Sequence, residues 1–406
     1  MQVGLSSCVD ILGLRNSQLE GGNMPVHSHT TRRWIGLSRR SCLIGLAVLA
    51  CGSLSLAAIG TASAAPKVKS SVLTTFPKLP TSKIKIAVVT GGPNSYYTPG
   101  PYAVAAAKKA LPGVTISFVV PPNPDFLPSI QSSTIDSLVA KGYNAFAVSP
   151  VGESAMIPTY ARLAARGIPI IDWASCSTPP TTALFCFATD VKASAAYEVG
   201  VLAKAMGGKG NIAFLTGLLT DPNTVLRVAG VNEGIAATHG AVKLLETVSN
   251  IDTPSAAPPA VESLLASKGS ELQGMMSTDY YPSVAEASVL TKEPQFRHII
   301  TIGQDNDPVV MNAIAKHYIY GTMYQNPYGQ VYVAVTWLEK ILADGCTISP
   351  TAPWVKGAST PRFIDSGYFF VGQSSISKYI GGLETIPTVT SQVLANTSKY
   401  LSCPSS

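Results

Sequence analysis

Polar and aromatic side chains follow short apolar runs in this sequence, in positions that could bind a small molecule. Asn94, Tyr96 and Tyr97 come after the β-branched run 84–89 and the helix- and strand-breaking Gly-Gly-Pro at 91–93. We therefore expect these three residues in a loop at the carboxyl end of a buried strand. In an open parallel sheet that edge is where ligands bind.

Similar residues recur further along the chain, at predicted strand ends, a crossover and a helix start. The full candidate set is Asn94, Tyr96, Tyr97, Asp172, Trp173, Asn223, Arg227, Asp279, Asp305 and Gln325. Carboxylate, amide and guanidinium groups hydrogen-bond to hydroxyls, and aromatic rings cover apolar C–H faces. A sugar or polyol presents both kinds of surface, so the set predicts such a ligand, with no catalytic role for any member.

Each candidate also has a purely structural interpretation. The three aspartates and Asn223 suit helix N-caps, because their side-chain oxygens accept hydrogen bonds from the first helical turn. Arg227 fits a solvated helix face, Trp173 fits a core position, and Tyr96 or Tyr97 fits ordinary loop packing.

The elements that must position these residues alternate between strands and helices. Strands are predicted at 84–89, 114–120, 145–149, 168–172, 211–215, 241–247, 272–277, 298–302, 318–323 and 363–371. Such alternation is typical of βαβ units on a parallel sheet. A break rich in Ser, Thr and Pro at 175–182 divides the pattern into two series. We therefore predict an α/β protein with two doubly wound, Rossmann-like lobes.

The last elements have to return to the first lobe, so the chain is expected to cross a hinge more than once. The predicted parts are a signal peptide, a linker, two discontinuous lobes and a tail. Their boundaries are 1–64, 65–82, 83–188 with about 326–362, 189–325 with about 363–382, and 383–406.

The first 64 residues predict export. Arginines at 32, 33, 39 and 40 precede an apolar stretch at 43–59 and an Ala-x-Ala site ending at Ala64. This order is typical of a cleaved secretion signal, and the arginine pair at 39–40 weakly resembles a twin-arginine signal. Cys51 loosely fits a lipid-anchor site, so a lipid-anchored protein is the alternative to a periplasmic one. Met24 is an alternative start.

Composition limits the classes of partner. The chain has 406 residues, of which 46% are hydrophobic and 13% charged, enough for two domains. The formal charge is +6, but the first 64 residues hold five arginines and two acidic residues, which leaves +3 for the rest. Without a basic stripe, a nucleic-acid partner is not expected.

The exported part keeps four cysteines, Cys176, Cys186, Cys346 and Cys403. An even number in an oxidising compartment favours two disulfides. The pairing closest in sequence joins the first two and leaves the last two; four buried thiols are the alternative. No Cys-x-x-Cys occurs and the exported histidines are scattered, so we expect no metal and no cofactor.

Seven short motifs together resemble the type 1 periplasmic substrate-binding proteins of ATP-driven importers, in their ribose-binding-like branch. The resemblance covers roughly residues 83–380. The motifs are Asn-Ser-Tyr-Tyr at 94–97, Ile-Ile-Asp-Trp at 170–173, Ala-Thr-Asp at 188–190, Asn-x-x-x-Arg-x-x-Gly at 223–230, Met-Ser-Thr-Asp at 276–279, Ile-Gly-Gln-Asp at 302–305 and Tyr-Gln-Asn-Pro at 324–327. Departures are Val231 where phenylalanine is usual, Ser277-Thr278 in place of the common Asn, and the insertion 344–362.

The resemblance implies a monomeric binding protein that closes on a small polar ligand, most often a sugar, and delivers it to the membrane permease of an ABC importer. A ligand sensor for a membrane receptor would share the same pocket and stays an alternative. An exported hydrolase is less favoured, because there is no Gly-x-Ser-x-Gly motif and the Ser-x-x-Lys at 375–378 lacks companion motifs.

Overall fold

The computed structural model describes residues 75–123, 125–219, 221–358, 360–378 and 387–404, which all belong to one compact unit. The expected signal peptide, most of the expected linker and the start of the expected tail lie outside the described residues. Within the described ranges, no helix combines the length and the apolar character needed to cross a membrane.

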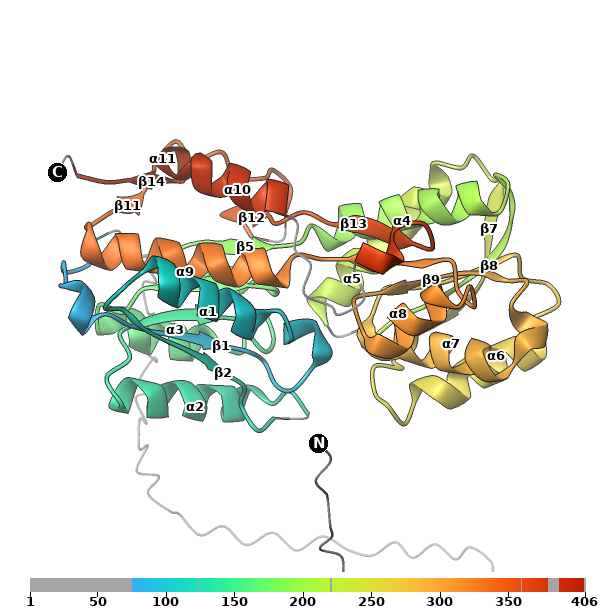
Figure 1. Ribbon diagram of the computed structural model, residues 1–406, viewed down its shortest axis with the longest axis horizontal. Helices are drawn as coiled ribbons and strands as arrows, with labels where there is room; N and C mark the ends of the chain where they lie inside the picture. The colour runs from blue at the N-terminus through green and yellow to red at the C-terminus, as the bar shows by residue number, and fades with distance from the viewer. Residues whose placement is uncertain (1–74, 124, 220, 359, 379–386, 405–406) are drawn as a thin grey trace, which may run out of the picture. The chain divides into compact units, whose positions relative to one another are not determined.

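The first lobe is built on a six-stranded parallel sheet with the order β12-β5-β4-β3-β1-β2. Its strands are β1 (Lys85–Val89), β2 (Thr115–Val119), β3 (Ala145–Val148), β4 (Ile170–Trp173), β5 (Cys186–Ala188) and β12 (Phe363–Asp365). Its helices are α1 (Gly100–Ala110), α2 (Pro128–Ala140), α3 (Ile157–Ala165) and α9 (Pro327–Ala343), and Figure 1 shows them around the sheet.

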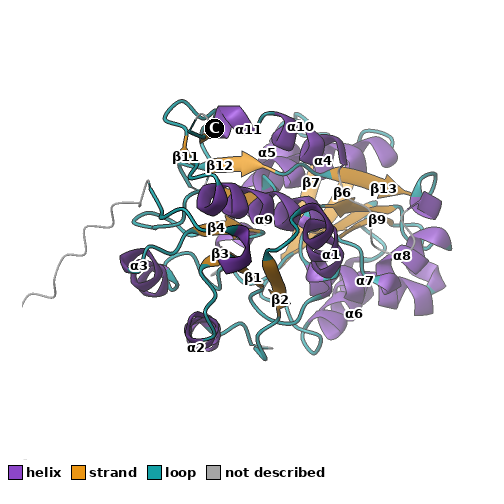
Figure 2. Cartoon of the chain, turned by 60° about the vertical axis from the view of Figure 1, so that its left-hand side comes forward, coloured by secondary structure: helices purple, strands orange, loops and turns teal. Residues whose placement is uncertain are grey.

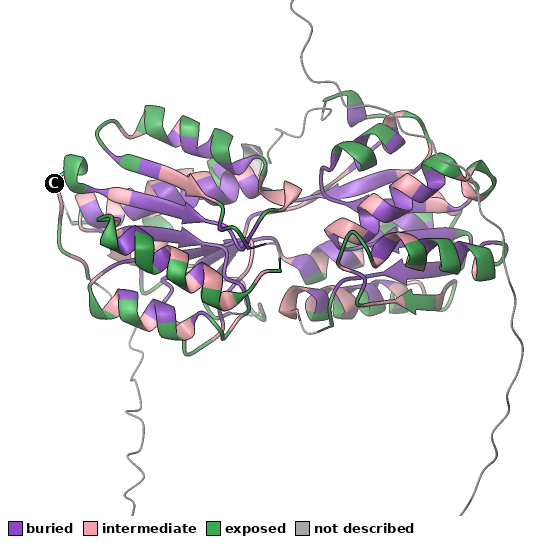
Figure 3. Cartoon of the chain, turned by 90° about the horizontal axis from the view of Figure 1, so that it is seen from below, coloured by how far each residue is buried: buried purple, intermediate pink, exposed green. Residues whose placement is uncertain are grey.

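Successive residues of these strands pack on opposite faces of the sheet, as the period of two requires. Ile86 and Val88 belong to the apolar cluster that includes residues of α1 and α9. Ala87 and Val89 belong to the cluster that includes residues of α2 and α3. Because both faces are covered, the central strands are buried on both sides, and Figure 3 shows them as buried ribbons inside partly exposed helices.

The second lobe repeats this plan with the order β13-β10-β9-β8-β6-β7, in which only β13 runs antiparallel. Its strands are β6 (Gly210–Leu215), β7 (Val242–Val248), β8 (Gly274–Ser277), β9 (Ile300–Gln304), β10 (Gly321–Tyr324) and β13 (Phe369–Gly372). Its helices are α4 (Val191–Ala205), α5 (Pro222–Ala236), α6 (Ala257–Lys268), α7 (Tyr280–Lys292) and α8 (Pro308–Ala315). The predicted α/β class with two doubly wound lobes is confirmed, and Figure 2 shows helices packed about both sheets.

The chain passes between the lobes more than once, as predicted. The described crossings are 189–190 between β5 and α4, 325–326 between β10 and α9, and 366–368 between β12 and β13. Hydrogen bonds tie them together: Gln330 Nε2 donates to Ser366 Oγ at 2.8 Å, and Asn326 Nδ2 donates to the Ser366 carbonyl at 2.9 Å. Asp190 N donates to Asp365 Oδ1 at 3.0 Å, which links the first crossing to the third.

One predicted strand and one lobe boundary need correction. The single strand expected at 363–371 is two strands, β12 and β13, that lie in different sheets. Residues 363–365 were assigned to the second lobe, but they pair with β5 of the first. The two strands are only three residues apart in sequence, and Gly367, with a φ of 83°, forms the turn that separates them.

The described part of the tail is packed on the first lobe. It contains α10 (Pro387–Ala395), α11 (Thr397–Tyr400) and β14 (Leu401–Ser402), which pairs with β11 (Thr347–Ile348). Val393 and Leu401 join the cluster that contains α9. Two disulfides are present, as expected: Cys346–Cys403, with a Cα separation of 4.0 Å, and Cys176–Cys186, with 5.6 Å.

Candidate functional site

A cavity of about 110 Å³ lies where the carboxyl ends of strands from both sheets meet. It is lined by Asn94, Tyr96, Tyr97, Ala174, Ser175, Asn223, Arg227, Asp252, Asp279, Tyr280, Asp305 and Gln325. Eight of the ten residues predicted from the sequence are in this set; the exceptions are Asp172 and Trp173. The β1–α1 loop contributes at the point where the first sheet reverses its strand order, which is the expected place for a ligand in a doubly wound sheet.

The first lobe contributes an amide and two rings from the short helix η2 (Ser95–Tyr97) and the residue before it. Asn94 Oδ1 caps this turn by accepting from Tyr96 N at 2.8 Å. The Tyr96 hydroxyl donates to Gln330 Oε1 at 2.8 Å, and the Tyr97 hydroxyl lies 3.1 Å from Ser149 Oγ. Both hydroxyls are thereby anchored, which leaves the rings as the surface offered to the cavity.

The second lobe contributes an ion pair between Arg227 of α5 and Asp279, which precedes α7. Arg227 Nη1 and Asp279 Oδ1 are 2.7 Å apart, and both side chains are largely buried, with 12% and 8% exposed. Asp279 Oδ2 also accepts from Thr216 Oγ1 at 3.0 Å and Gly217 N at 2.8 Å. Asp279 makes no N-cap bond to α7, so the capping interpretation does not hold for it.

The pKa of Arg227 is governed by two opposing effects. Burial by itself lowers the pKa, but the nearby carboxylates of Asp279, Asp305, Asp221 and Asp252 raise it, and the net pKa lies above the ordinary value. Arg227 is therefore a permanent cation, held in place by Asp279.

Asp305 and Gln325 are joined at the end of β9 and β10. Gln325 Nε2 donates to Asp305 Oδ1 at 2.8 Å, and Gln304 Nε2 donates to the same oxygen at 3.1 Å. Asp305 has a φ of 65°, a left-handed conformation that a non-glycine residue adopts at a cost and that is common at functional sites. Burial raises the pKa of Asp305, while the Gln325 hydrogen bond and Arg227 lower it. The N-cap of α8 is Asp307 instead of Asp305.

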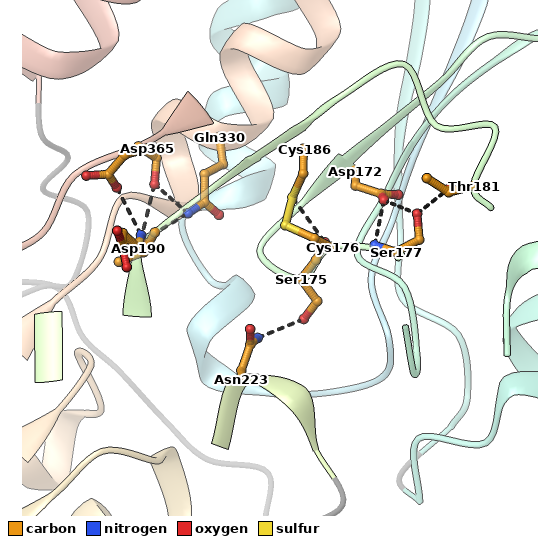
Figure 4. The surroundings of a disulfide bond; sticks show 12 residues. Asp172, Ser175, Cys176, Ser177, Thr181, Cys186, Asp190, Asn223, Gln330 and Asp365 are labelled. Carbon is orange, nitrogen blue, oxygen red and sulfur yellow. Dashed lines mark hydrogen bonds between the residues drawn. A yellow bond between two sulfur atoms is a disulfide. The ribbon is translucent and has the colours of Figure 1, made fainter. Parts of the chain in front are cut away.

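Asn223 does not cap its helix either. The cap of α5 is Asp221, whose carboxylate accepts from the amides of residues 223 and 224. Asn223 Nδ2 instead donates to Ser175 Oγ of the first lobe at 3.3 Å (Figure 4). A second bond between the lobes joins the Tyr280 hydroxyl to Ser95 Oγ at 2.7 Å.

Asp172 does not line this cavity, because its side chain points to the face of the first sheet that α3 covers. Its carboxylate accepts from the Tyr160 hydroxyl of α3 at 2.7 Å. It also accepts from Ser177 N at 2.8 Å, as Figure 4 shows. Burial raises its pKa to about 6, and the bonds from Ser177 and Tyr160 lower it. Asp172 lines a separate space of about 330 Å³ that includes Thr181 and Arg362.

Trp173 takes the core position that was its structural alternative. It is fully buried in the cluster with α9, and its ring meets Tyr97 edge-on at a centroid distance of 5.4 Å. Its Nε1 has no hydrogen-bond partner among the described residues. Adjacent strand residues alternate between the faces of a sheet, so Trp173 lies on the α9 side and Asp172 on the α3 side. Trp173 does not line the cavity but packs against the ring of Tyr97, which does.

The sequence reasoning missed four lining residues: Ala174, Ser175, Asp252 and Tyr280. Asp252 follows β7 as the predicted candidates follow their strands, so the same criterion applied to that strand would have found it. Tyr280 opens α7 directly after Asp279. Ser175 begins the break predicted at 175–182 between the two series of strands and helices, and nothing in the sequence marked it as a lining residue.

Two further carboxyl groups lie beneath the cavity in the second lobe. Glu198 of α4 and Glu286 of α7 are completely buried, and burial raises the pKa of each well above its ordinary value. In both cases burial favours the neutral form of the carboxyl group over the charged one. Among the described residues, no group of three or more His, Cys, Asp or Glu side chains is placed to hold a metal ion.

Comparison with known proteins connects this geometry to a family. Residues 86–345 match the model of the periplasmic binding protein domain. A xylitol-binding protein of Mycolicibacterium smegmatis is 27% identical over 198 residues, which is 49% of this chain and 56% of that protein. The match thus spans little more than half the length of this curated relative.

Solved structures share the fold. An ABC transporter solute-binding protein of Burkholderia graminis in complex with D-arabinose has a TM-score of 0.65 and 23% identity, and the match covers 74% of this chain and 99% of that one. A periplasmic solute-binding protein of Actinobacillus succinogenes with bound D-allose has a TM-score of 0.63 and 18% identity, over 73% and 100% of the two chains.

Proposed function

The chain belongs to the periplasmic binding protein domain family, and we propose that it is an exported solute-binding protein that captures a single sugar or polyol. The observation that carries this proposal is the convergence of eight predicted residues, from strand ends, a crossover and a helix start, on one cavity between the lobes. Family members are binding proteins, so the chemistry required is recognition alone.

The cavity offers a ligand both hydrogen-bond donors and hydrogen-bond acceptors that are not used within the protein. Among the described residues, Asp305 Oδ2 and Gln325 Oε1 have no partner and act as acceptors. Arg227 uses only Nη1 for Asp279, and Asn94 uses only Oδ1 for Tyr96 N, so both retain donors. A hydroxyl both donates and accepts, so a polyhydroxylated ligand can satisfy this mixed set.

The size of the cavity favours a small ligand. At about 110 Å³ it is well below the roughly 300–1,000 Å³ of drug-sized ligand pockets. The rings of Tyr96 and Tyr97 supply apolar surface for C–H faces, while buried polar groups penalise analogues that lack a hydroxyl. This combination suits one pentose, hexose or sugar alcohol better than an oligosaccharide. The relative that binds xylitol and the neighbours with bound D-arabinose and D-allose support the same class.

We infer that the ligand bridges the lobes and stabilises the arrangement in which they close, by its higher affinity for that form. The crossings at 189–190, 325–326 and 366–368 supply the hinge. The closed protein would then deliver its ligand to the permease of an ABC importer from the periplasm. A sensing role at a membrane receptor would use the same cavity and differ only in the docking partner.

The test is a thermal-shift screen of the purified protein against pentoses, hexoses, pentitols and hexitols, since a ligand that binds only the folded state raises Tm. Arg227→Ala and Asp305→Ala should each abolish the shift from the best compound. Arg162→Ala and Asp136→Ala are matched controls from an exposed ion pair at 2.9 Å and should keep it. No shift from any compound, or a full shift in both cavity variants, would contradict the proposal. Release of a modified compound during incubation would instead favour an enzyme.

A further inference from the structure

Asp252 occupies a distinct place in the cavity, on the loop between β7 and α6. Ile251 beside it is buried in the second lobe's core and anchors the loop. Asn250 adopts a left-handed conformation with a φ of 62°, and its backbone N donates to the Gly217 carbonyl at 2.8 Å. Asn250 Oδ1 also accepts from Leu219 N at 3.1 Å. The β6 and β7 loops are thus tied together, which holds Asp252 at the cavity wall with little freedom.

The other carboxylates around the cavity each have a hydrogen-bond or ion-pair partner, but no such partner of Asp252 is found among the described residues. Asp279 is paired with Arg227, Asp305 accepts from Gln325, and Asp221 caps α5. No hydrogen bond or ion pair is formed by the Asp252 side chain within the described ranges, although this side chain lines the cavity. A confined carboxylate without a donor is unfavourable, so it is primed to accept from a ligand.

The charge of the cavity wall is strongly unbalanced. Among the described lining residues, Arg227 is the single cation, and Asp252, Asp279 and Asp305 are acidic. Arg227 forms its ion pair with Asp279. The negative charges of ionised Asp252 and Asp305 therefore have no cation of their own among the described lining residues. Burial, Asp279 and Asp221 raise the pKa of Asp252 to about 7, and Arg227 lowers it, which agrees with an excess of negative charge there.

We propose that Asp252 is a ligand-contacting residue that sets specificity: it accepts a hydrogen bond from a ligand hydroxyl and rejects sugars that carry a carboxylate or phosphate. Hydroxyl donors satisfy the carboxylate, whereas a ligand anion in this small cavity meets Asp252 and Asp305 together. Like charges about 5 Å apart in such surroundings lower affinity by roughly 100-fold. This inference rests on the proposed function and names the ligand class more narrowly, as uncharged polyols or sugars.

The experiment compares pairs of compounds with the same carbon skeleton: xylitol with xylonate, ribitol with ribonate, and D-arabinitol with D-arabinonate. Calorimetry at pH 8 on the whole purified protein gives the ratio of Kd values within each pair. The wild type should bind the best pentitol about 100-fold more tightly than its aldonate. Asp252→Asn should weaken pentitol binding about 5- to 20-fold. It should also lower the ratio of the aldonate Kd to the pentitol Kd at least about 10-fold.

Controls separate this effect from general loss of charge or folding. Glu246→Gln removes one carboxylate from the exposed side of β7 and should leave both the Kd values and their ratio unchanged. Asp252→Ser should narrow the ratio as Asp252→Asn does, because both remove the charge. A wild-type ratio that persists in both Asp252 variants would overturn the specificity role while leaving the proposed function intact. Failure of the wild type to bind any pentitol or other polyol or sugar would overturn both.

Discussion

The charged residues around the cavity differ in whether a group of opposite charge lies beside them, and this difference decides their roles. The Arg227–Asp279 pair is buried, and Asp279 makes additional bonds that fix its orientation. A buried pair of this kind contributes little net stability, but loss of one partner leaves an unpaired buried charge that costs about 3–5 kcal/mol. The pair therefore serves to hold a guanidinium rigidly at the cavity wall.

The pKa of Asp252 predicts a stability that depends on pH. Its pKa in the folded protein is about 7, above the ordinary 3.8, because of burial, Asp279 and Asp221, with Arg227 opposing and Tyr281 also close. The folded state thus holds a proton that the unfolded chain has released between pH 4 and pH 7. The contribution of Asp252 to the free energy of unfolding is therefore fully present below about pH 4 and is lost as the pH rises through 7.

We therefore expect Asp252→Asn to raise the Tm of the ligand-free protein at pH 8, by about 2–4 °C, with a smaller difference at pH 5. Differential scanning fluorimetry at both pH values provides the measurement, and Glu246→Gln serves as the control because its carboxylate is exposed. A variant that is less stable than the wild type at pH 8 would show that Asp252 has a stabilising partner.

At the scale of elements, the C-terminal segment is fastened to the first lobe in several ways. The Cys346–Cys403 disulfide lies beside the β11–β14 ladder, where Ile348 pairs with Leu401. Trp337 Nε1 of α9 also donates to Thr397 Oγ1 at 3.1 Å. The disulfide closes a loop with a sequence separation of 57, for which chain entropy predicts a contribution of about 4 kcal/mol.

The double variant Cys346→Ser with Cys403→Ser should therefore lower the unfolding free energy by up to about 4 kcal/mol, measured by urea denaturation. The matched variant Cys176→Ser with Cys186→Ser closes a shorter loop, with a separation of 10, and should lose about 3 kcal/mol. No residue of the described tail lines the cavity, so the first variant should keep its ligand-induced shift. Loss of ligand binding without loss of stability would contradict this separation.

At the scale of the whole molecule, hydrogen bonds connect the cavity to the segments that cross between the lobes. Tyr96 of the cavity donates to Gln330, and Gln330 donates to Ser366 in the third crossing. Across the cavity, Tyr280 bonds to Ser95 and Asn223 bonds to Ser175. Contacts that exist only while the lobes touch favour the closed form, so they add to the apparent affinity for any ligand of that form.

Ser95→Ala should consequently weaken the best polyol about 5-fold, because one hydrogen bond between the lobes contributes about 1 kcal/mol. Ser95 does not line the ligand cavity, so direct contact does not account for such a change. Calorimetry supplies Kd, and small-angle scattering should show a more open ligand-free protein. Ser133→Ala, which removes only a local bond on α2, is the control. Equal affinities in all three proteins would argue against a contribution of this contact.

The sequence by itself determined the α/β class, the two lobes and most of the cavity. Apolar runs that alternate with helical segments dictate parallel sheets, and parallel strands bring their carboxyl ends to one edge. Asn94 could therefore be selected from its position after a strand, and Arg227, Asp305 and Gln325 from short motifs that resemble those of periplasmic binding proteins. An even cysteine count in a chain expected to be exported predicted two disulfides.

Only the tertiary structure decided which side chains face the cavity. Asp172 and Trp173 are the last two residues of β4, which ends one residue beyond the predicted strand. The pleat and the twist of the sheet turn Asp172 toward α3 and Trp173 into the core with α9. Ser175 lines the cavity and bonds to Asn223, which is 48 residues away in sequence, and no local pattern encodes this contact. Side-chain direction and long-range pairing arise from packing between distant segments, so they become visible only once the chain is folded.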